Sequence, residues 1–342
     1  MAIRLTGFAD EAGKDLADQI RAHRDLGWDT IEMRMVGDVN FTNLDDDAYE
    51  AVKGQLAAAG MGVSCFGSAI ANWARPISAD FRQDLDDLRR AAPRMRELGT
   101  RFIRVMSYPN DQDRPRSKPE WFGEALRRLR ELTRVAEDEG VVLAHENCSG
   151  YGAESPGEML ELILAINSPA FRMAFDTGNQ NAHHGYANPD LAWEYYRAVR
   201  PYIVHVHVKD GNPGADGTAV HCMPGEGRSQ VRRIVGDLVA TGYDGFISIE
   251  PHIKAQVHLA QSAGRSADAF NMYVEYGRRM AGILREALAQ PAPAGAGAEK
   301  PATRAKAKGK AKPSAAKRPK PAKPAKRAKP AGKKKAAKRK KK

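Results

Sequence analysis

Short apolar runs alternate with longer amphipathic stretches from residue 3 to residue 288. The runs have the length of buried β-strands, whereas the longer stretches, such as Trp121 to Glu139, repeat apolar residues at helical spacing. Eight strand candidates begin near Ile3, Thr30, Gly62, Arg101, Val141, Phe171, Tyr202 and Gly245. Strands that alternate with helices favour a parallel α/β architecture.

A glycine precedes most of the later strand candidates, where a helix is expected to end. These residues are Gly27, Gly60, Gly99, Gly140 and Gly242. Glycine is frequent at helix ends because it adopts the left-handed conformation easily. The order helix, glycine, strand over about 250 residues predicts one (β/α)8 TIM barrel. A doubly wound open sheet is the alternative, but Gly7-Phe-Ala-Asp-Glu-Ala-Gly after the first strand is not a phosphate-binding fingerprint.

The end of the chain has a different composition. After Leu288 it contains no Val, Ile, Leu, Met, Phe, Tyr or Trp. Such a segment cannot bury enough apolar surface to offset the entropy lost on folding. We therefore expect a barrel over 1–288 and a disordered tail, rich in Lys, Ala and Pro, over 289–342.

The two parts carry opposite net charge. The tail holds 21 of the 54 Lys and Arg residues and one of the 42 Asp and Glu residues, a net charge of +20. The remaining 33 bases and 41 acids give residues 1–288 a net charge of −8. Any affinity for nucleic acid or another polyanion is therefore expected in the tail, through the release of counterions.

Four side chains that can bind a metal each close one of the last four strand candidates. They are Glu146, Asp176, His207 and Glu250, at intervals of 30, 31 and 43 residues. One βα unit takes about 30 residues or more, and active sites in such barrels lie at the carboxyl ends of the strands. Three carboxylates and one imidazole suit one divalent ion: Mn²⁺, Mg²⁺, Co²⁺ or Zn²⁺.

Other residues at the same end of the barrel are candidates for binding substrate. Lys209 shares a strand face with His207, and Arg34 shares one with Glu32, so either cation could bind a substrate phosphate, carboxylate or enolate oxygen. An ion pair with Asp210 or another acid at the rim is the alternative for Lys209. Two further candidates are Asn179, three residues after Asp176, and His183, which we expect in a loop. An ordinary surface histidine is the alternative for His183. One layer below the four metal-binding side chains, alternation places Ala144, Ala174, His205 and Ser248.

Four segments carry a resemblance to a known family: His145-Glu-Asn-Cys, Phe175-Asp-Thr-Gly-Asn, His205-Val-His-Val-Lys-Asp and Ser248-Ile-Glu-Pro-His. They resemble the sugar phosphate isomerase/epimerase family, whose fold is the xylose isomerase-like TIM barrel, over about residues 3–288. The resemblance implies that Glu146, Asp176, His207 and Glu250 are metal ligands. It also implies that Glu146 and Glu250 are the acid/base pair that moves a proton next to a carbonyl through a metal-stabilised enediolate.

The resemblance leaves the reaction and the substrate open. Asn179 and Pro213 stand where related ketose epimerases often carry His and Arg, so the sugar or polyol substrate is undetermined. A dehydratase for inososes or keto acids is one alternative. An endonuclease IV-like DNA repair enzyme is another, but segments 62–70 and 101–110 lack the histidines that it needs. An idle barrel with a nucleoid-binding tail is the third, because the tail resembles those of histone H1-like proteins.

The remaining signals concern the compartment. Cys65, Cys148 and Cys222 have no paired spacing, and the amino terminus lacks the long apolar core of a signal peptide. No apolar run is long enough to span a membrane. We expect a cytoplasmic protein that the tail could bring to the nucleoid. A homo-oligomer is compatible with the sequence, since barrels of this kind often associate.

Overall fold

Eight parallel strands form one sheet in the computed structural model, which describes residues 3–253 and 265–290. They are β1 (Arg4–Gly7), β2 (Thr30–Met33), β5 (Gly62–Phe66), β6 (Phe102–Ser107), β7 (Val142–Gly150), β8 (Phe171–Asp176), β9 (Ile203–Val208) and β12 (Phe246–Ile249). Their order is β1-β12-β9-β8-β7-β6-β5-β2. Each begins within a residue or two of a predicted start, so the strand predictions are confirmed. Apart from residues 289 and 290, the predicted tail lies outside the described residues.

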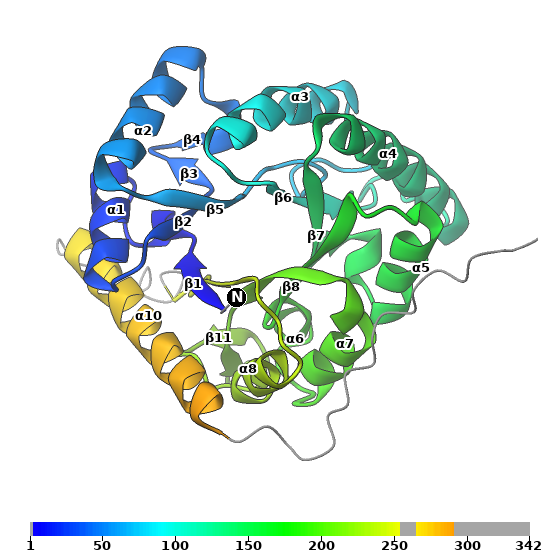
Figure 1. The fold of residues 1–342 in the computed structure, drawn as a ribbon. Coiled ribbons are helices and arrows are strands. Elements are labelled where there is room, and N and C mark those ends of the chain that lie inside the picture. Colours follow the sequence, from blue (N-terminus) through cyan, green and yellow to red (C-terminus); the bar gives the residue numbers. More distant parts are fainter. Residues whose placement is uncertain (1–2, 254–264, 291–342) are drawn as a thin grey trace, which may run out of the picture. The chain divides into compact units, whose positions relative to one another are not determined.

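The two edge strands of this sheet, β1 and β2, meet and nearly close the barrel. Phe8 forms a parallel bridge with Glu32, and the Thr6 hydroxyl donates to the Thr30 carbonyl oxygen at 3.1 Å. Helices surround the ring of strands (Figure 1). The fold is therefore a TIM barrel, as the alternation of apolar and amphipathic segments predicts.

The helices follow the strands in chain order, with 3₁₀ turns between them. The α-helices are α1 (Leu16–Asp25), α2 (Asp46–Ala59), α3 (Arg82–Glu97), α4 (Lys118–Glu139), α5 (Pro156–Ile166), α6 (Asn179–His183), α7 (Leu191–Val199), α8 (Val231–Ala240) and α10 (Arg265–Ala289). The 3₁₀ turns are η1 (Ala9–Glu11), η2 (Phe41–Asn43), η3 (Tyr151–Ala153) and η4 (Arg200–Tyr202). Helix α10 ends one residue past the predicted boundary at Leu288, within the usual uncertainty of a helix end.

Local sequence accounts for the helix ends. Helix α2 begins where the Asp45 carboxylate accepts from the Ala48 amide at 2.8 Å, and it ends at Gly60, whose φ is +65°. A side chain would strain this left-handed conformation. The same conformation occurs at the other four predicted glycines, Gly27, Gly99, Gly140 and Gly242.

Two antiparallel hairpins extend the loops at the carboxyl ends of the strands. One consists of β3 (Met35–Val36) and β4 (Val39–Asn40) after β2, and the other of β10 (Gly211–Pro213) and β11 (Ala219–His221) after β9. Asp210 anchors the second hairpin, because its carboxylate accepts four backbone N–H groups from Gly211, Gly225, Gly227 and Ser229. The loop around Lys209 is thereby held to the barrel.

Strand side chains divide between two environments. Ile31, Val206 and Ile247 belong to the apolar core between the strands and the helices. The other strand face carries the small residues Ala144 and Ala174 together with buried polar residues: Thr6, Ser64, Arg104, His205 and Ser248. Burying polar groups costs free energy, so proteins do so mainly where those groups are needed. The interior of this barrel is therefore a candidate location for a functional site.

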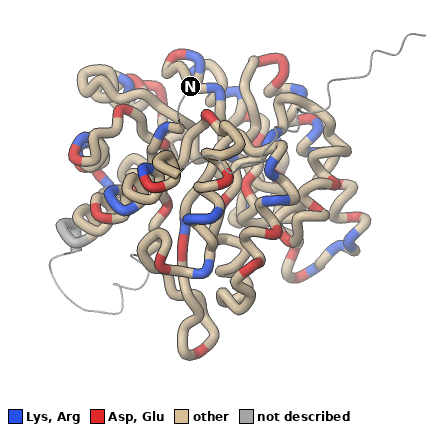
Figure 2. The backbone as a smooth tube through the Cα atoms, turned by 60° about the horizontal axis from the view of Figure 1, so that its bottom comes forward, with Lys and Arg blue, Asp and Glu red and all other residues tan. Residues whose placement is uncertain are grey.

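Positions of basic and acidic residues are interspersed along the described backbone (Figure 2). No helix within residues 3–253 and 265–290 is long and apolar enough to cross a membrane.

Candidate metal centre

Four buried side chains meet at the carboxyl ends of neighbouring strands. Glu146 lies on β7, Asp176 ends β8, His207 lies on β9 and Glu250 follows β12 directly. One ligand atom from each of the four lies within 4.8 Å of the ligand atoms of the others. The four residues, successive ones of which lie 30 to 43 residues apart along the chain, thus form one compact group. Three carboxylates and an imidazole could hold a divalent metal ion.

The strand register explains why these side chains meet. Asp176 lies opposite His207 across β8 and β9, and Ala174 lies opposite His205 one layer below. Ala144 and Ala174 are fully buried and small, so they leave room for the larger side chains above them. His205 is also fully buried, in the layer where alternation along the strand places it.

Three carboxylate oxygens of the group support its fit to a cation. Glu146 Oε2, Asp176 Oδ2 and Glu250 Oε2 are buried and have no hydrogen-bond partner among the described residues. The second Asp176 oxygen is fixed by the backbone, since Oδ1 accepts from the amides of Gly178 at 2.7 Å and Asn179 at 2.6 Å. Asp176 Oδ2 is therefore the oxygen left to bind an ion. Anionic oxygens in a buried position need a positive charge nearby.

Two cations of the chain supply part of this charge. Arg104 Nη1 lies 3.3 Å from Glu146 Oε2, and Lys209 Nζ lies 3.5 Å from Asp176 Oδ2 and 3.4 Å from Glu250 Oε2. Burial favours the neutral form of Glu250, but the positive charges of Lys209, His252 and Arg34 outweigh it and hold the pKa of Glu250 well below its usual range.

The other two carboxylates of the group differ from each other. Burial acts against ionisation of Glu146, but Arg104 and then His207 outweigh it, so its pKa is lowered. Burial raises the pKa of Asp176 more than the charge of Lys209 lowers it, and the neighbouring glutamates raise it further. A bound cation would favour the ionised form of all three.

Two of the residues predicted to bind substrate lie at this group. Lys209 is 2% exposed, and its ammonium donates to Asn179 Oδ1 at 2.7 Å. The Asn179 amide in turn donates to Glu146 Oε1 at 3.1 Å. Both residues therefore lie beside the four-residue group. Lys209 also forms ion pairs, but its partners are the buried Asp176 and Glu250 rather than Asp210, whose carboxylate accepts backbone N–H groups.

The other two predicted residues are placed differently. The Arg34 guanidinium lies 4.3 Å from the centre of the Phe8 ring and is bonded to Asp10 at 2.9 Å, Glu11 at 3.2 Å and Glu250 at 2.8 Å. Its donors are directed at carboxylates of the chain. His183 is the last residue of α6 rather than part of a loop, and it is exposed. Partial burial and then the charge of Lys209 lower its pKa.

Two charged residues at the site were not among the predicted site residues. Arg104 pairs with Glu146, and Glu32 accepts hydrogen bonds from His205 and His207. Their sequence signal is a charge inside an apolar strand, in Phe102-Ile-Arg-Val-Met and Thr30-Ile-Glu-Met. A charged residue within an apolar strand is expected to be buried, and a buried charge requires a partner of opposite charge. Such a position therefore indicates a buried ion pair.

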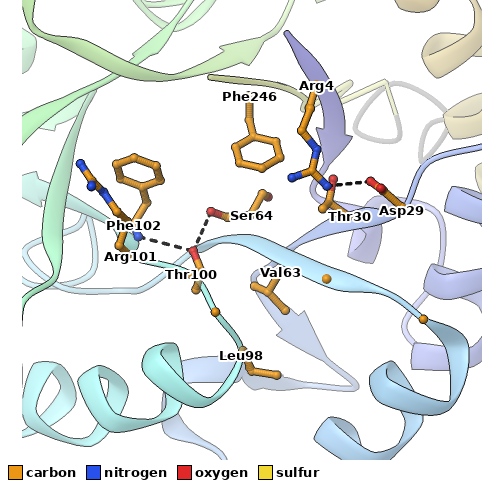
Figure 3. A pocket seen from close by; sticks show the side chains of 13 residues that line it. Arg4, Asp29, Thr30, Val63, Ser64, Leu98, Thr100, Arg101, Phe102 and Phe246 are labelled. Atoms are coloured by element: carbon orange, nitrogen blue, oxygen red, sulfur yellow. Dashed lines mark hydrogen bonds and ion pairs between the residues drawn. The ribbon is translucent and has the colours of Figure 1, made fainter. Parts of the chain in front are cut away.

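A hollow of about 430 Å³ lies at the other end of the barrel (Figure 3). Its lining includes Arg4, Thr30 and Phe246, the first residues of β1, β2 and β12. Arg4 is paired with Asp29 at 2.8 Å beside it. Catalytic groups of TIM barrels lie at the carboxyl ends of the strands, whereas this hollow lies at the amino ends, so we do not assign it as the catalytic site.

Comparison with known proteins agrees with this fold. Residues 20–272 match the sequence model of the xylose isomerase-like TIM barrel family, so the chain belongs to that family. A solved structure of a xylose isomerase-like TIM barrel protein from Mycobacterium smegmatis, in complex with magnesium, superposes with a TM-score of 0.63 at 19% identity, over 84% of this chain and 98% of that one.

Two relatives match part of the chain. An uncharacterized protein of Methanocaldococcus jannaschii is 33% identical over 125 residues, which are 36% of this chain and 41% of that protein. Fructoselysine 3-epimerase of Escherichia coli is 25% identical over 132 residues, 38% of this chain and 45% of the epimerase. The chain thus matches less than half the length of either relative.

Proposed function

We propose that this protein is a divalent-metal-dependent isomerase or epimerase that moves a proton on a carbon next to the carbonyl of a sugar or polyol. The observation that carries the proposal is the buried group of Glu146, Asp176, His207 and Glu250, in which three carboxylate oxygens accept no hydrogen bond from the described residues. The family and the partial match to an epimerase support the same class of reaction.

The metal would be held by these four residues, and when bound it would supply the positive charge that offsets the negative charge growing on the substrate's carbonyl oxygen. Magnesium in a related barrel supports a hard divalent ion. Lys209, beside Asp176 and Glu250, would add a second positive charge that orients a substrate oxygen.

Glu146 and Glu250 would move the proton. They come from β7 and from the end of β12, with β8 and β9 between them in the sheet, so they approach the site from two sides. Each is anchored through Oε1, Glu146 by Asn179 and Glu250 by Arg34. Within the described chain each Oε2 accepts no hydrogen bond and has only an ion-pair partner, Arg104 for Glu146 and Lys209 for Glu250. One carboxylate accepts the proton from carbon, and the other returns a proton to the opposite face or to the neighbouring carbon.

The proposal is tested by hydrogen exchange. The full chain is loaded with Mn²⁺ or Mg²⁺, and ketoses, inososes and 3-keto sugars are screened in D₂O by NMR, with Mg²⁺ for the spectra. We expect deuterium at a carbon next to the carbonyl and its loss in Glu146→Gln and Glu250→Gln. An alkene signal with release of water would identify a dehydratase instead. Absence of exchange with every substrate, together with no bound metal, would contradict the proposal.

A further inference from the structure

Glu32 is a buried acid on β2 that lies outside the four-residue group. Its side chain is 1% exposed. The pairing of β2 with β5 shifts register between Ile31 and Glu32, and Phe8 bridges to Glu32 where the barrel closes. A local irregularity of this kind redirects a side chain. Here the carboxylate crosses the barrel interior to β9.

Both oxygens of Glu32 are bonded to histidine rings. Oε2 lies 2.8 Å from His205 Nε2, and Oε1 lies 3.1 Å from His207 Nε2. The other nitrogen of His207, Nδ1, lies 3.2 Å from Glu146 Oε1. His207 therefore contacts Glu32 through one ring nitrogen and faces Glu146, another member of the metal-binding group, through the other.

These contacts determine which ring nitrogen carries the proton. A carboxylate only accepts hydrogen bonds, so Nε2 must carry a hydrogen in both histidines. Nδ1 of His207 also faces a carboxylate, that of Glu146, so without a metal it carries a hydrogen as well. A cation bound to the group would take the place of the hydrogen on Nδ1 and leave the one on Nε2, which Glu32 holds.

We propose that Glu32 is a positioning residue for the metal centre: it holds His207 in the Nε2–H tautomer and thereby presents Nδ1 to the ion. His205 occupies the second oxygen, so the carboxylate cannot rotate away from His207 without losing a hydrogen bond in a buried place. The inference rests on the proposed function only in that the group binds a divalent ion. It concerns metal binding rather than turnover.

The tautomer and the affinity can be measured without substrate. NMR of ¹⁵N-histidine in the metal-free and Zn²⁺-loaded chain reports which nitrogen of His207 is protonated, and calorimetry with Zn²⁺ and Mn²⁺ gives the affinity. We expect protonated Nε2 and metal-bound Nδ1 in the wild type. Glu32→Ala should weaken metal binding by roughly 10- to 100-fold, as such partners generally do. Glu32→Gln should give a smaller loss, because its amide can accept from only one of the two histidines.

Ser64→Ala is the matched control. Ser64 is buried in the same interior and bonds to Thr6 and to the Ile31 carbonyl oxygen. Its removal should leave the metal affinity within about twofold of the wild type, since it disturbs packing without touching the histidines.

Three results would overturn the inference: wild-type affinity in Glu32→Ala, metal bound to His207 Nε2, or a wild-type chain that binds no divalent ion. If Glu32→Ala does not fold, the metal affinity of Glu32→Gln and the tautomer of His207 in the wild type test the inference. Weakened metal binding without exchange on any sugar would refute the proposed function and leave the role of Glu32 standing. If the wild type exchanges deuterium into a sugar but Glu32→Ala binds metal with unchanged affinity, the proposed function would stand and the role of Glu32 would be refuted.

Discussion

At the residue scale, each of the two proposed acid/base glutamates is paired with an arginine beside the same aromatic ring. Arg34 bonds to Glu250, Arg104 pairs with Glu146, and both guanidinium groups lie near the Phe8 ring, at 4.3 and 5.3 Å from its centre. A buried arginine with its donors on carboxylates is fixed in place. These arginines are therefore suited to orienting the glutamates.

Arg34 gives a prediction that separates orientation from substrate binding. Arg34→Gln should lower kcat roughly tenfold and leave KM within about twofold, because the interaction lost is with Glu250. Steady-state kinetics on the substrate found by exchange measure both constants. Arg4→Gln, an arginine at the opposite end of the barrel, is the control and should change neither. A rise in KM alone would assign Arg34 to substrate binding.

The site residues differ in how far the sequence determined them. Glu146, Asp176, His207 and Glu250 were recognisable because strand-end position and βα spacing are local properties. Arg104 and Glu32 were not assigned, since their partners lie 42 to 175 residues away along the chain. Which nitrogen of His207 faces the group depends on those partners as well. Only the assembled barrel shows it.

At the scale of elements, strands and helix ends follow from local patterns, whereas contacts between elements depend on single buried groups. His23 on α1 is such a group. It is fully buried, and its ring nitrogens bond to the Thr30 carbonyl oxygen at 2.6 Å and to the Tyr273 hydroxyl at 2.9 Å. It thereby joins α1, β2 and α10. Its place on an apolar helical face is visible in the sequence, but its two partners are not.

This histidine should make stability depend on pH. Burial lowers the pKa of His23 to about 4, so between pH 4 and its ordinary value near 6.5 the unfolded chain binds more protons than the folded one. The burial of neutral His23 therefore does not reduce the free energy of unfolding above about pH 6.5. As the pH falls from 6.5 toward 4, the free energy of unfolding should decrease by up to about 3 kcal/mol.

Urea unfolding of the wild type and of His23→Gln between pH 7.5 and 4.5 measures this effect. The wild type should lose more stability than the variant over that range. Comparing the two cancels the contributions of the other histidines, including buried His145, whose pKa burial lowers to about 3. Parallel pH dependence in both proteins would show that His23 does not contribute.

At the scale of the whole molecule, the chain combines a mildly acidic barrel with a strongly basic tail. The net charges are −8 for residues 1–288 and +20 for residues 289–342. Acidic and basic positions are interspersed along the described backbone (Figure 2). The proposed chemistry and any binding of nucleic acid thus belong to separate parts of the sequence.

Cutting the chain after Gln290 tests this separation, because the cut keeps the whole of α10. The truncated chain should retain metal content and turnover and lose salt-sensitive retention on a DNA column, since the whole net charge of +20 on the tail is removed. A full-length chain with its tail lysines replaced by glutamine is the matched control and should behave like the truncated one. Retention of DNA by the truncated barrel would place a nucleic-acid site on the folded part. Loss of turnover in the truncated chain alone, with the glutamine variant still active, would mean that the tail supports the barrel by something other than its charge.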